Sequence, residues 1–159
     1  MMVKLLPLIC LKEIIQRLTI QGNHTKTNYS GVPSVVFTIP PLASVGLQES
    51  VAREQGLHFK TNFQKNTCGW YTSRRIGESY SGFKVLVEQR QGNATTTNGN
   101  DDYGSNDGGR VLGAHLLGTH AEEIINIFAL AIKFRLNITD IKDMIFSYPT
   151  KSSDIGYML

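Results

Sequence analysis

The chain has 159 residues, which suits one domain and permits a hydrophobic core that needs no disulfide or metal. Hydrophobic residues make up 41% of the sequence and charged residues 18%, a composition that excludes an intrinsically disordered protein. The net charge of +3 comes from scattered residues. No basic stripe interleaved with aromatic residues accompanies it, so we expect no nucleic-acid partner.

The cysteines and histidines predict no metal site. Cys10 and Cys68 are too far apart for a CxxC pair, and the four histidines lack metal-ligand spacing. The apolar start of the chain superficially resembles a signal peptide, but no small-residue cleavage site follows it. We therefore expect a cytoplasmic protein without a membrane partner.

The first third of the chain predicts a helix, a linker and the beginning of a sheet. Apolar residues at steps of three and four predict an amphipathic helix over residues 5–21, and residues 23–31 are polar and rich in turn formers. Residues 34–38 and 43–45 predict strands separated by a proline pair. Residues 48–55 predict a short helix that ends at Gly56.

The middle of the chain predicts three more strands. Leu57, Phe59, Thr61 and Phe63 alternate with polar residues, which predicts that they form the buried face of a strand over residues 57–65. Residues 69–80 give no clear pattern. Residues 83–88 and 110–117 predict an antiparallel hairpin. Residues 91–109, rich in Asn, Gly, Thr and Asp, predict a flexible insertion at its tip.

A strongly apolar helix follows the hairpin. Thr119 to Glu122 match a capping box, and residues 124–134 are apolar on nearly every side. Residues 139–146 predict a second helix. The fold class is therefore α+β, an antiparallel sheet covered on one side by helices. One sheet face cannot cover the whole first helix, so we expect a homodimer. Its interface would include Ile124, Ile127, Phe128 and Ala131.

Two segments far apart in the sequence point to one protein family. Residues 37–46 (FTIPPLASVG) and 146–150 (FSYPT) resemble the two ends of the C-terminal dimerisation domain of FAD-dependent pyridine nucleotide–disulfide oxidoreductases, the group of glutathione, mercuric and dihydrolipoamide reductases. Residues 113–134 resemble the same domain. The resemblance implies two parts: residues 1–31 as a remnant of the flavin-domain helix plus a linker, and residues 32–159 as the dimerisation domain.

The segments with which this family holds its cofactors have no counterpart here. The sequence contains no Gly-x-Gly-x-x-Gly turn after a strand, no redox-active cysteine pair and no nicotinamide-binding insertion. The resemblance therefore implies FAD and NAD(P) in the parent protein, and we expect none to be bound by this chain alone. We expect the chain alone to be inactive.

The tail departs from the pattern of the disulfide-reducing members, in which a His-Pro-Thr sequence and a following Glu supply an acid/base pair across the dimer. Tyr148 stands at the His position and Ser153 at the Glu position, with Asp154 next to it. A phenol with a pKa of roughly 10 is a poor proton shuttle at neutral pH. Tyr148 and Asp154 remain the candidate catalytic residues. Alternatively, Tyr148 and Pro149 pack in the dimer interface.

These observations leave three hypotheses. The first is a dimerisation domain, or a truncated form, of an FAD/NAD(P)-dependent disulfide-reductase-like oxidoreductase that is not catalytic alone. The alternative is that the Tyr148 and Asp154 tail supplies half of a composite active site to a separate flavoprotein reductase. A third, a small-ligand-binding module that uses a groove between sheet and tail, has no positive feature in the sequence.

Overall fold

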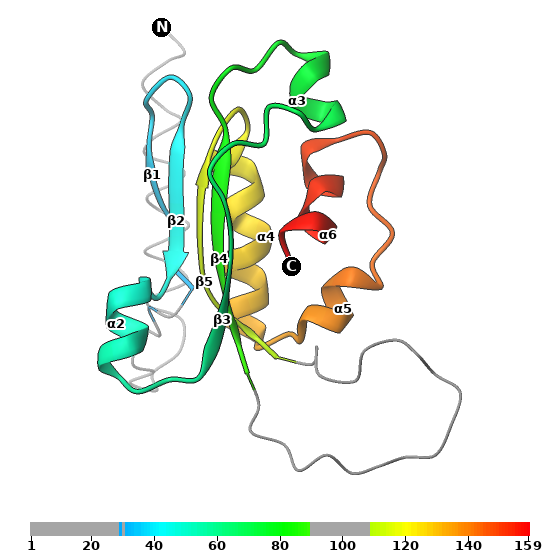
Figure 1. Cartoon of the computed structure of the whole chain (residues 1–159). Coiled ribbons are helices and arrows are strands. Elements are labelled where there is room, and N and C mark those ends of the chain that lie inside the picture. The colour runs from blue at the N-terminus through cyan, green and yellow to red at the C-terminus, as the bar shows by residue number, and fades with distance from the viewer. Residues whose placement is uncertain (1–28, 30, 90–108) are drawn as a thin grey trace, which may run out of the picture.

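The computed structural model describes residues 29, 31–89 and 109–159. Five antiparallel strands form one sheet in the order β1-β2-β5-β4-β3. The strands are β1 (Ser34–Val36), β2 (Leu42–Gly46), β3 (Phe59–Gln64), β4 (Gly82–Glu88) and β5 (Val111–Leu117). Figure 1 shows helices α4 (Ala121–Phe134), α5 (Ile138–Lys142) and α6 (Ile155–Met158) on one face, and α2 (Glu49–Glu54) on the other. The predicted α+β class is confirmed.

The β4–β5 hairpin lies at the centre of the sheet, as the alternating sequence predicts. Phe83 pairs with Leu116 and Val85 with Ala114. Gly113 of β5 passes so close to the chain after β2 that a Cβ at this position would lie 2.0 Å from the carbonyl oxygen of Leu47. The predicted insertion at residues 91–109 lies outside the described residues except for Gly109, and the predicted helix at residues 5–21 lies wholly outside them.

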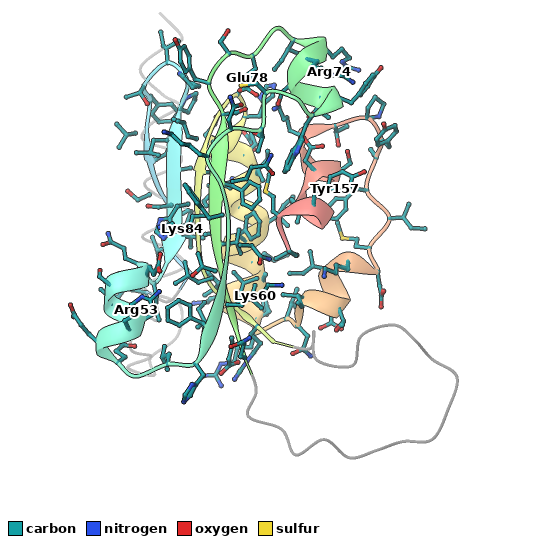
Figure 2. All side chains as sticks on the ribbon, in the orientation of Figure 1. Arg53, Lys60, Arg74, Glu78, Lys84 and Tyr157 are labelled. Atoms are coloured by element: carbon teal, nitrogen blue, oxygen red, sulfur yellow. The ribbon has the colours of Figure 1, made fainter. Side chains whose placement is uncertain are left out.

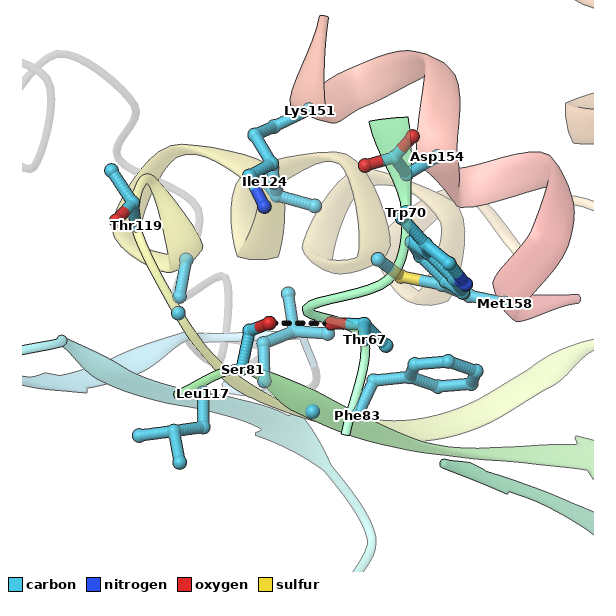
Figure 3. Close-up of a pocket in the computed structure, with 14 residues that line it drawn as sticks. Thr67, Trp70, Ser81, Phe83, Leu117, Thr119, Ile124, Lys151, Asp154 and Met158 are labelled. Atoms are coloured by element: carbon cyan, nitrogen blue, oxygen red, sulfur yellow. Dashed lines mark hydrogen bonds between the residues drawn. The ribbon is translucent and has the colours of Figure 1, made fainter. Parts of the chain in front are cut away.

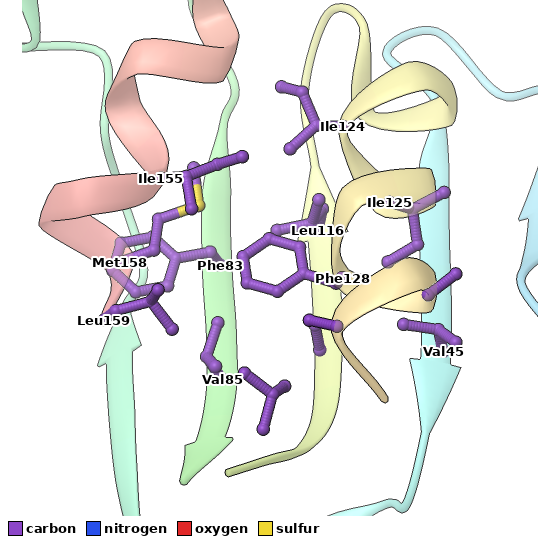
Figure 4. Packing of buried hydrophobic residues seen from close by; sticks show 14 of the residues in the cluster. Val45, Phe83, Val85, Leu116, Ile124, Ile125, Phe128, Ile155, Met158 and Leu159 are labelled. Carbon is purple, nitrogen blue, oxygen red and sulfur yellow. The ribbon is translucent and has the colours of Figure 1, made fainter. Parts of the chain in front are cut away.

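The hydrophobic core lies between the sheet and the C-terminal helices. Figure 4 shows Phe128 of α4 beside Phe83 of β4, with Ile155 and Met158 contributed by the last helix. Phe128 and Ile155 are completely buried. The tail is therefore a structural part of this domain, since its apolar side chains complete the core.

The position of α4 corrects part of the predicted dimer interface. Ile124, Phe128 and Ala131 are buried inside the chain itself, so they have no surface left to offer a partner. The prediction that these three residues form the interface is therefore wrong. Sheet and tail together cover more of the helix than a single sheet face would. Ile127 is only partly buried.

The prediction for β3 is wrong about which face is buried. Asn62 pairs with Val85, so it faces the C-terminal helices, while Phe59, Thr61 and Phe63 face the opposite side. Phe63 is 61% exposed on that side. The reason is that β3 is an edge strand of the described sheet. Its apolar residues face the side on which α2 is the only helix among the described residues, and there the Arg53 guanidinium lies over the Phe59 ring at 5.5 Å.

The ends of the helices also differ from the sequence prediction. His120 is the residue before α4, in a left-handed conformation with φ 65°, and no side chain caps this helix. The predicted capping box at residues 119–122 is therefore wrong. Helix α5 ends at Lys142, earlier than predicted, and the 69–80 segment contains a short helix, α3 (Tyr71–Arg75). In the tail, a 3-10 helix, η1 (Lys151–Asp154), leads into α6.

Candidate functional site at the C-terminal tail

The tail that carries the candidate residues is bound firmly to the sheet. The side-chain amide of Asn62 donates hydrogen bonds to the carbonyl oxygens of Met158 (3.3 Å) and Leu159 (2.8 Å). Trp70 lies between Phe83 and Tyr157, with ring centroids 5.6 and 5.8 Å away. Backbone carbonyls at the end of a helix lack hydrogen-bond donors within the helix. Asn62 of β3 supplies these donors.

A buried ion pair holds the first turn of the tail. The Lys151 Nζ donates to Glu78 Oε2 at 2.6 Å and to Ser73 Oγ at 2.7 Å. The other carboxylate oxygen of Glu78 accepts the backbone N–H of Thr119. We call these four residues the Lys151 cluster. The side chains of Lys151 and Glu78 are only 13% and 3% exposed, so the pair is shielded from water.

The cluster keeps Glu78 ionised. Burial by itself would raise the pKa of this carboxyl group, but the hydrogen bonds from Lys151 and Thr119 outweigh that effect and lower the pKa below its ordinary value. A carboxylate held in this way is a structural anchor. It joins the tail, the segment after α3 and the turn before α4, which lie far apart in the sequence.

Asp154, one of the two candidate catalytic residues, points into the interior. It is 4% exposed, and its carboxylate accepts a hydrogen bond from the Thr72 hydroxyl. Burial raises its pKa above the ordinary value, although the Thr72 hydrogen bond and the charge of Lys151 act in the opposite direction. The structure therefore places this carboxyl group in the interior, where it contacts α3.

Beneath Lys151 and Asp154 there is only a small cavity. Figure 3 shows these residues on the tail side and the hydrogen bond from Thr67 Oγ1 to Ser81 Oγ (2.7 Å) on the sheet side. The cavity measures about 30 Å³, which is room for one or two water molecules. It is too small for an organic substrate, and the hypothesis of a ligand groove between sheet and tail gains no support from it.

Tyr148, the other candidate, lies on the surface. Its side chain is 71% exposed, and its ring stacks on Tyr71 of α3 with centroids 6.3 Å apart and an interplanar angle of 21°. The structure therefore puts Tyr148 and Asp154 in opposite environments. In the described part of the chain no hydrogen bond joins them. Tyr148 is available to a second molecule, and Asp154 is not.

Sequence reasoning missed the residues that hold the tail in place. Glu78 and Lys151 are 73 positions apart, and neither belongs to a motif. Figure 2 shows Glu78 and Arg74 at the α3 end of the molecule and Tyr157 on the tail. The only feature of the sequence that points to Glu78 is that it is a lone acidic residue after an Arg-Arg pair. Spacing along the chain does not reveal which residue it pairs with.

The described residues do not fit a dinucleotide cofactor. FAD and NAD(P) sites of the Gly-x-Gly-x-x-Gly type need parallel strands joined through a helix, whereas every strand pair in the described sheet is antiparallel. Within residues 31–89 and 109–159, no three His, Cys, Asp or Glu side chains come together as a metal site. No helix of the described part is both long and apolar enough to cross a bilayer.

The described fold is an antiparallel sheet with a long apolar helix and a C-terminal tail packed on it. Comparisons with known proteins identify it as an assembly domain of the reductase type. Residues 105–158 match the dimerisation domain of pyridine nucleotide–disulphide oxidoreductases. A 19.7 kDa uncharacterized protein in a mercuric resistance operon of Staphylococcus aureus is 39% identical over 140 residues, 88% of this chain and 68% of that protein. The dihydrolipoyl dehydrogenase of Chlamydia muridarum is 32% identical over 138 residues, 86% of this chain.

A solved structure shows the same arrangement. RclA, an HOCl-induced flavoprotein disulfide reductase from Escherichia coli solved as a Cu(II) complex, superposes with a TM-score of 0.71 at 25% identity, over 95% of this chain and 30% of its own. This chain belongs to the pyridine nucleotide–disulphide oxidoreductase family and corresponds to its dimerisation domain. It spans 26% of the length of the dihydrolipoyl dehydrogenase it matches.

Proposed function

We propose that this domain assembles into a homodimer and that it is not catalytic alone, its FAD- and NAD(P)-binding parts belonging to a parent reductase. The observation that carries the proposal is an apolar stripe on the outer side of α4, formed by Ile127, Leu130 and Phe134. Leu130 and Phe134 are 53% and 67% exposed. Residues at these spacings share one side of a helix.

This outer stripe replaces the buried residues of the predicted interface. The inner side of α4 packs in the hydrophobic core, so only the outer side of this helix can contact a partner. Ile127 is shared between the original prediction and the stripe. Tyr148 and Pro149 remain in the proposed interface because the Tyr148 ring is exposed. Large apolar side chains that are left uncovered in a group mark interaction surfaces.

Sedimentation equilibrium at micromolar concentration tests the homodimer. We expect a dimer for the wild-type chain and a folded monomer for Leu130→Glu, because burying an unpaired carboxylate in the interface is unfavourable. Phe63→Glu is the matched control, since it adds the same charge at an exposed apolar residue on the other face of the sheet. A wild-type monomer with native circular dichroism, or a dimer disrupted by Phe63→Glu and not by Leu130→Glu, would refute this interface.

A second candidate function uses the tail. Tyr148 is exposed at the position where the disulfide-reducing members carry their acid/base histidine, so it would complete a composite active site on a separate flavoprotein reductase. Asp154 would act only indirectly, through the packing of the tail. The test mixes the chain with a flavoprotein reductase that lacks its own dimerisation domain and measures NAD(P)H oxidation. Stimulation that is lost in Tyr148→Phe supports the composite site, and no stimulation counts against it.

The remaining expectations belong to the same proposal. The division into residues 1–31 and 32–159 follows the family resemblance, and a cytoplasmic location suits a reductase domain of this kind. Mercury binding is not part of the proposal, although one relative is named for a mercuric resistance operon. Soft thiolates are the ligands for such a metal, and Cys68 is the one cysteine among the described residues.

A further inference from the structure

A hollow of about 220 Å³ opens on the surface between the tail and α3. It is lined by Thr72, Arg75, Ile76, His120, Pro149, Thr150 and Lys151. The lining thus contains three basic side chains and no acidic one. Its residues come from three separate segments of the chain, and the Lys151 cluster ties all three of these segments together.

Among the described residues around the hollow, no carboxylate compensates the charge of Arg75. Lys151 is neutralised by Glu78, and His120 has Glu122 3.9 Å away. The Arg75 side chain is exposed, and no ion pair or hydrogen bond joins it to another described residue. The Asp154 carboxyl group is buried and bonded to Thr72. The guanidinium group therefore presents a free planar set of donors, the geometry that matches a carboxylate or a phosphate.

We propose that this hollow binds a small anion with a carboxylate or phosphate group, with Arg75 as the principal partner. His120, which also lines the hollow, offers a second donor. Lys151 contributes its charge from below while it stays bonded to Glu78. The volume of the hollow suits an anion of a few heavy atoms. Pockets for drug-sized ligands begin at roughly 300 Å³.

The residues that line the hollow adjoin Tyr148 of the tail and Tyr71 of α3 in the sequence. Pro149 lines the hollow and follows Tyr148 directly, and Thr72 follows Tyr71, the residue on which Tyr148 stacks. The hollow and the two stacked rings therefore share the same two segments of the chain. The inference goes beyond the proposed function, because anion binding by a single chain requires neither a second copy nor a flavoprotein.

Binding is tested on the ¹⁵N-labelled full chain by NMR titration with inorganic phosphate in one series and acetate in another, at constant ionic strength. We expect saturable shifts of the amides of residues 72–76, 119–121 and 150–151 with at least one of the anions. The comparison of the two series identifies which anionic group the site prefers. Shifts that are absent, or that rise without saturation across the whole surface, would overturn the proposal.

The decisive comparison is between two neighbouring arginines. Arg75→Gln should weaken binding at least tenfold and Arg75→Lys less, because lysine keeps the charge without the planar donors. Arg74→Gln removes the same charge from the same helix at a residue that does not line the hollow, and should leave the affinity within about twofold. Equal losses in Arg75→Gln and Arg74→Gln would mean a diffuse surface field and would refute a site. A native amide spectrum for each variant shows that it is folded.

Discussion

Replacing Lys151 with methionine should destabilise the domain strongly. Methionine keeps most of the volume of the side chain but leaves Glu78 in the interior without its cation. Breaking a buried ion pair by removing one partner costs about 3–5 kcal/mol. Glu78 keeps the Thr119 N–H and the Ser73 hydroxyl, which lies 3.1 Å away, so we expect a loss near the lower end, about 3 kcal/mol.

Urea unfolding followed by circular dichroism measures the loss at one fixed protein concentration, since any association would change the apparent stability. With a urea dependence of about 2 kcal/mol per molar, the midpoint should fall by about 1.5 M. Lys84→Met is the matched control, because Lys84 pairs with Glu49 at 2.9 Å on the surface, where solvent screens the charges. The reasoning is refuted if the two variants lose similar stability, or if adding Glu78→Gln to Lys151→Met restores none of the loss.

Three further substitutions test the packing and the pKa assignments. Phe128→Ala should cost about 3–5 kcal/mol in urea unfolding, because the ring is completely buried, and a loss below 1 kcal/mol would contradict its place in the core. Gly113→Ala should lower the melting temperature, since its Cβ would lie 2.0 Å from the Leu47 carbonyl oxygen; an unchanged melting temperature would contradict this backbone contact. Asp154 has a raised pKa in the folded state, so its stabilising contribution is complete below its unfolded pKa and is lost as pH rises through the folded pKa. Asp154→Asn should therefore gain stability relative to wild type between pH 4 and pH 7, and a parallel pH dependence of the two proteins would disprove the assignment.

The sequence correctly predicts the central strands, in which one face buried against the helices sets the alternation of apolar and polar residues. The strands at 83–88 and 110–117 alternate because one side of each central strand packs against the C-terminal helices. For Phe59 and Phe63 the same alternation is misleading. It identifies which residues share a face, but the face on which the helices pack is decided by the strand order of the whole sheet.

The functional residues were harder to predict than the fold. Residues 124–134 are so uniformly apolar that periodicity cannot separate the core side, with Ile124 and Phe128, from the outer side, with Leu130 and Phe134. The tail motif drew attention to Tyr148 and Asp154, yet the residues that position the tail are Glu78 and Lys151. Such a pair arises from tertiary packing, and nothing local in the sequence records it.

The N–H of Thr119 has an unusual position in this domain. Its acceptor is the Glu78 carboxylate, which also binds Lys151 of the tail, so detachment of the last nine residues would expose this bond to solvent. The hydrogen-exchange rate of the Thr119 N–H would therefore report detachment of the C-terminal tail. The tail begins 32 positions further along the sequence and would itself need no label.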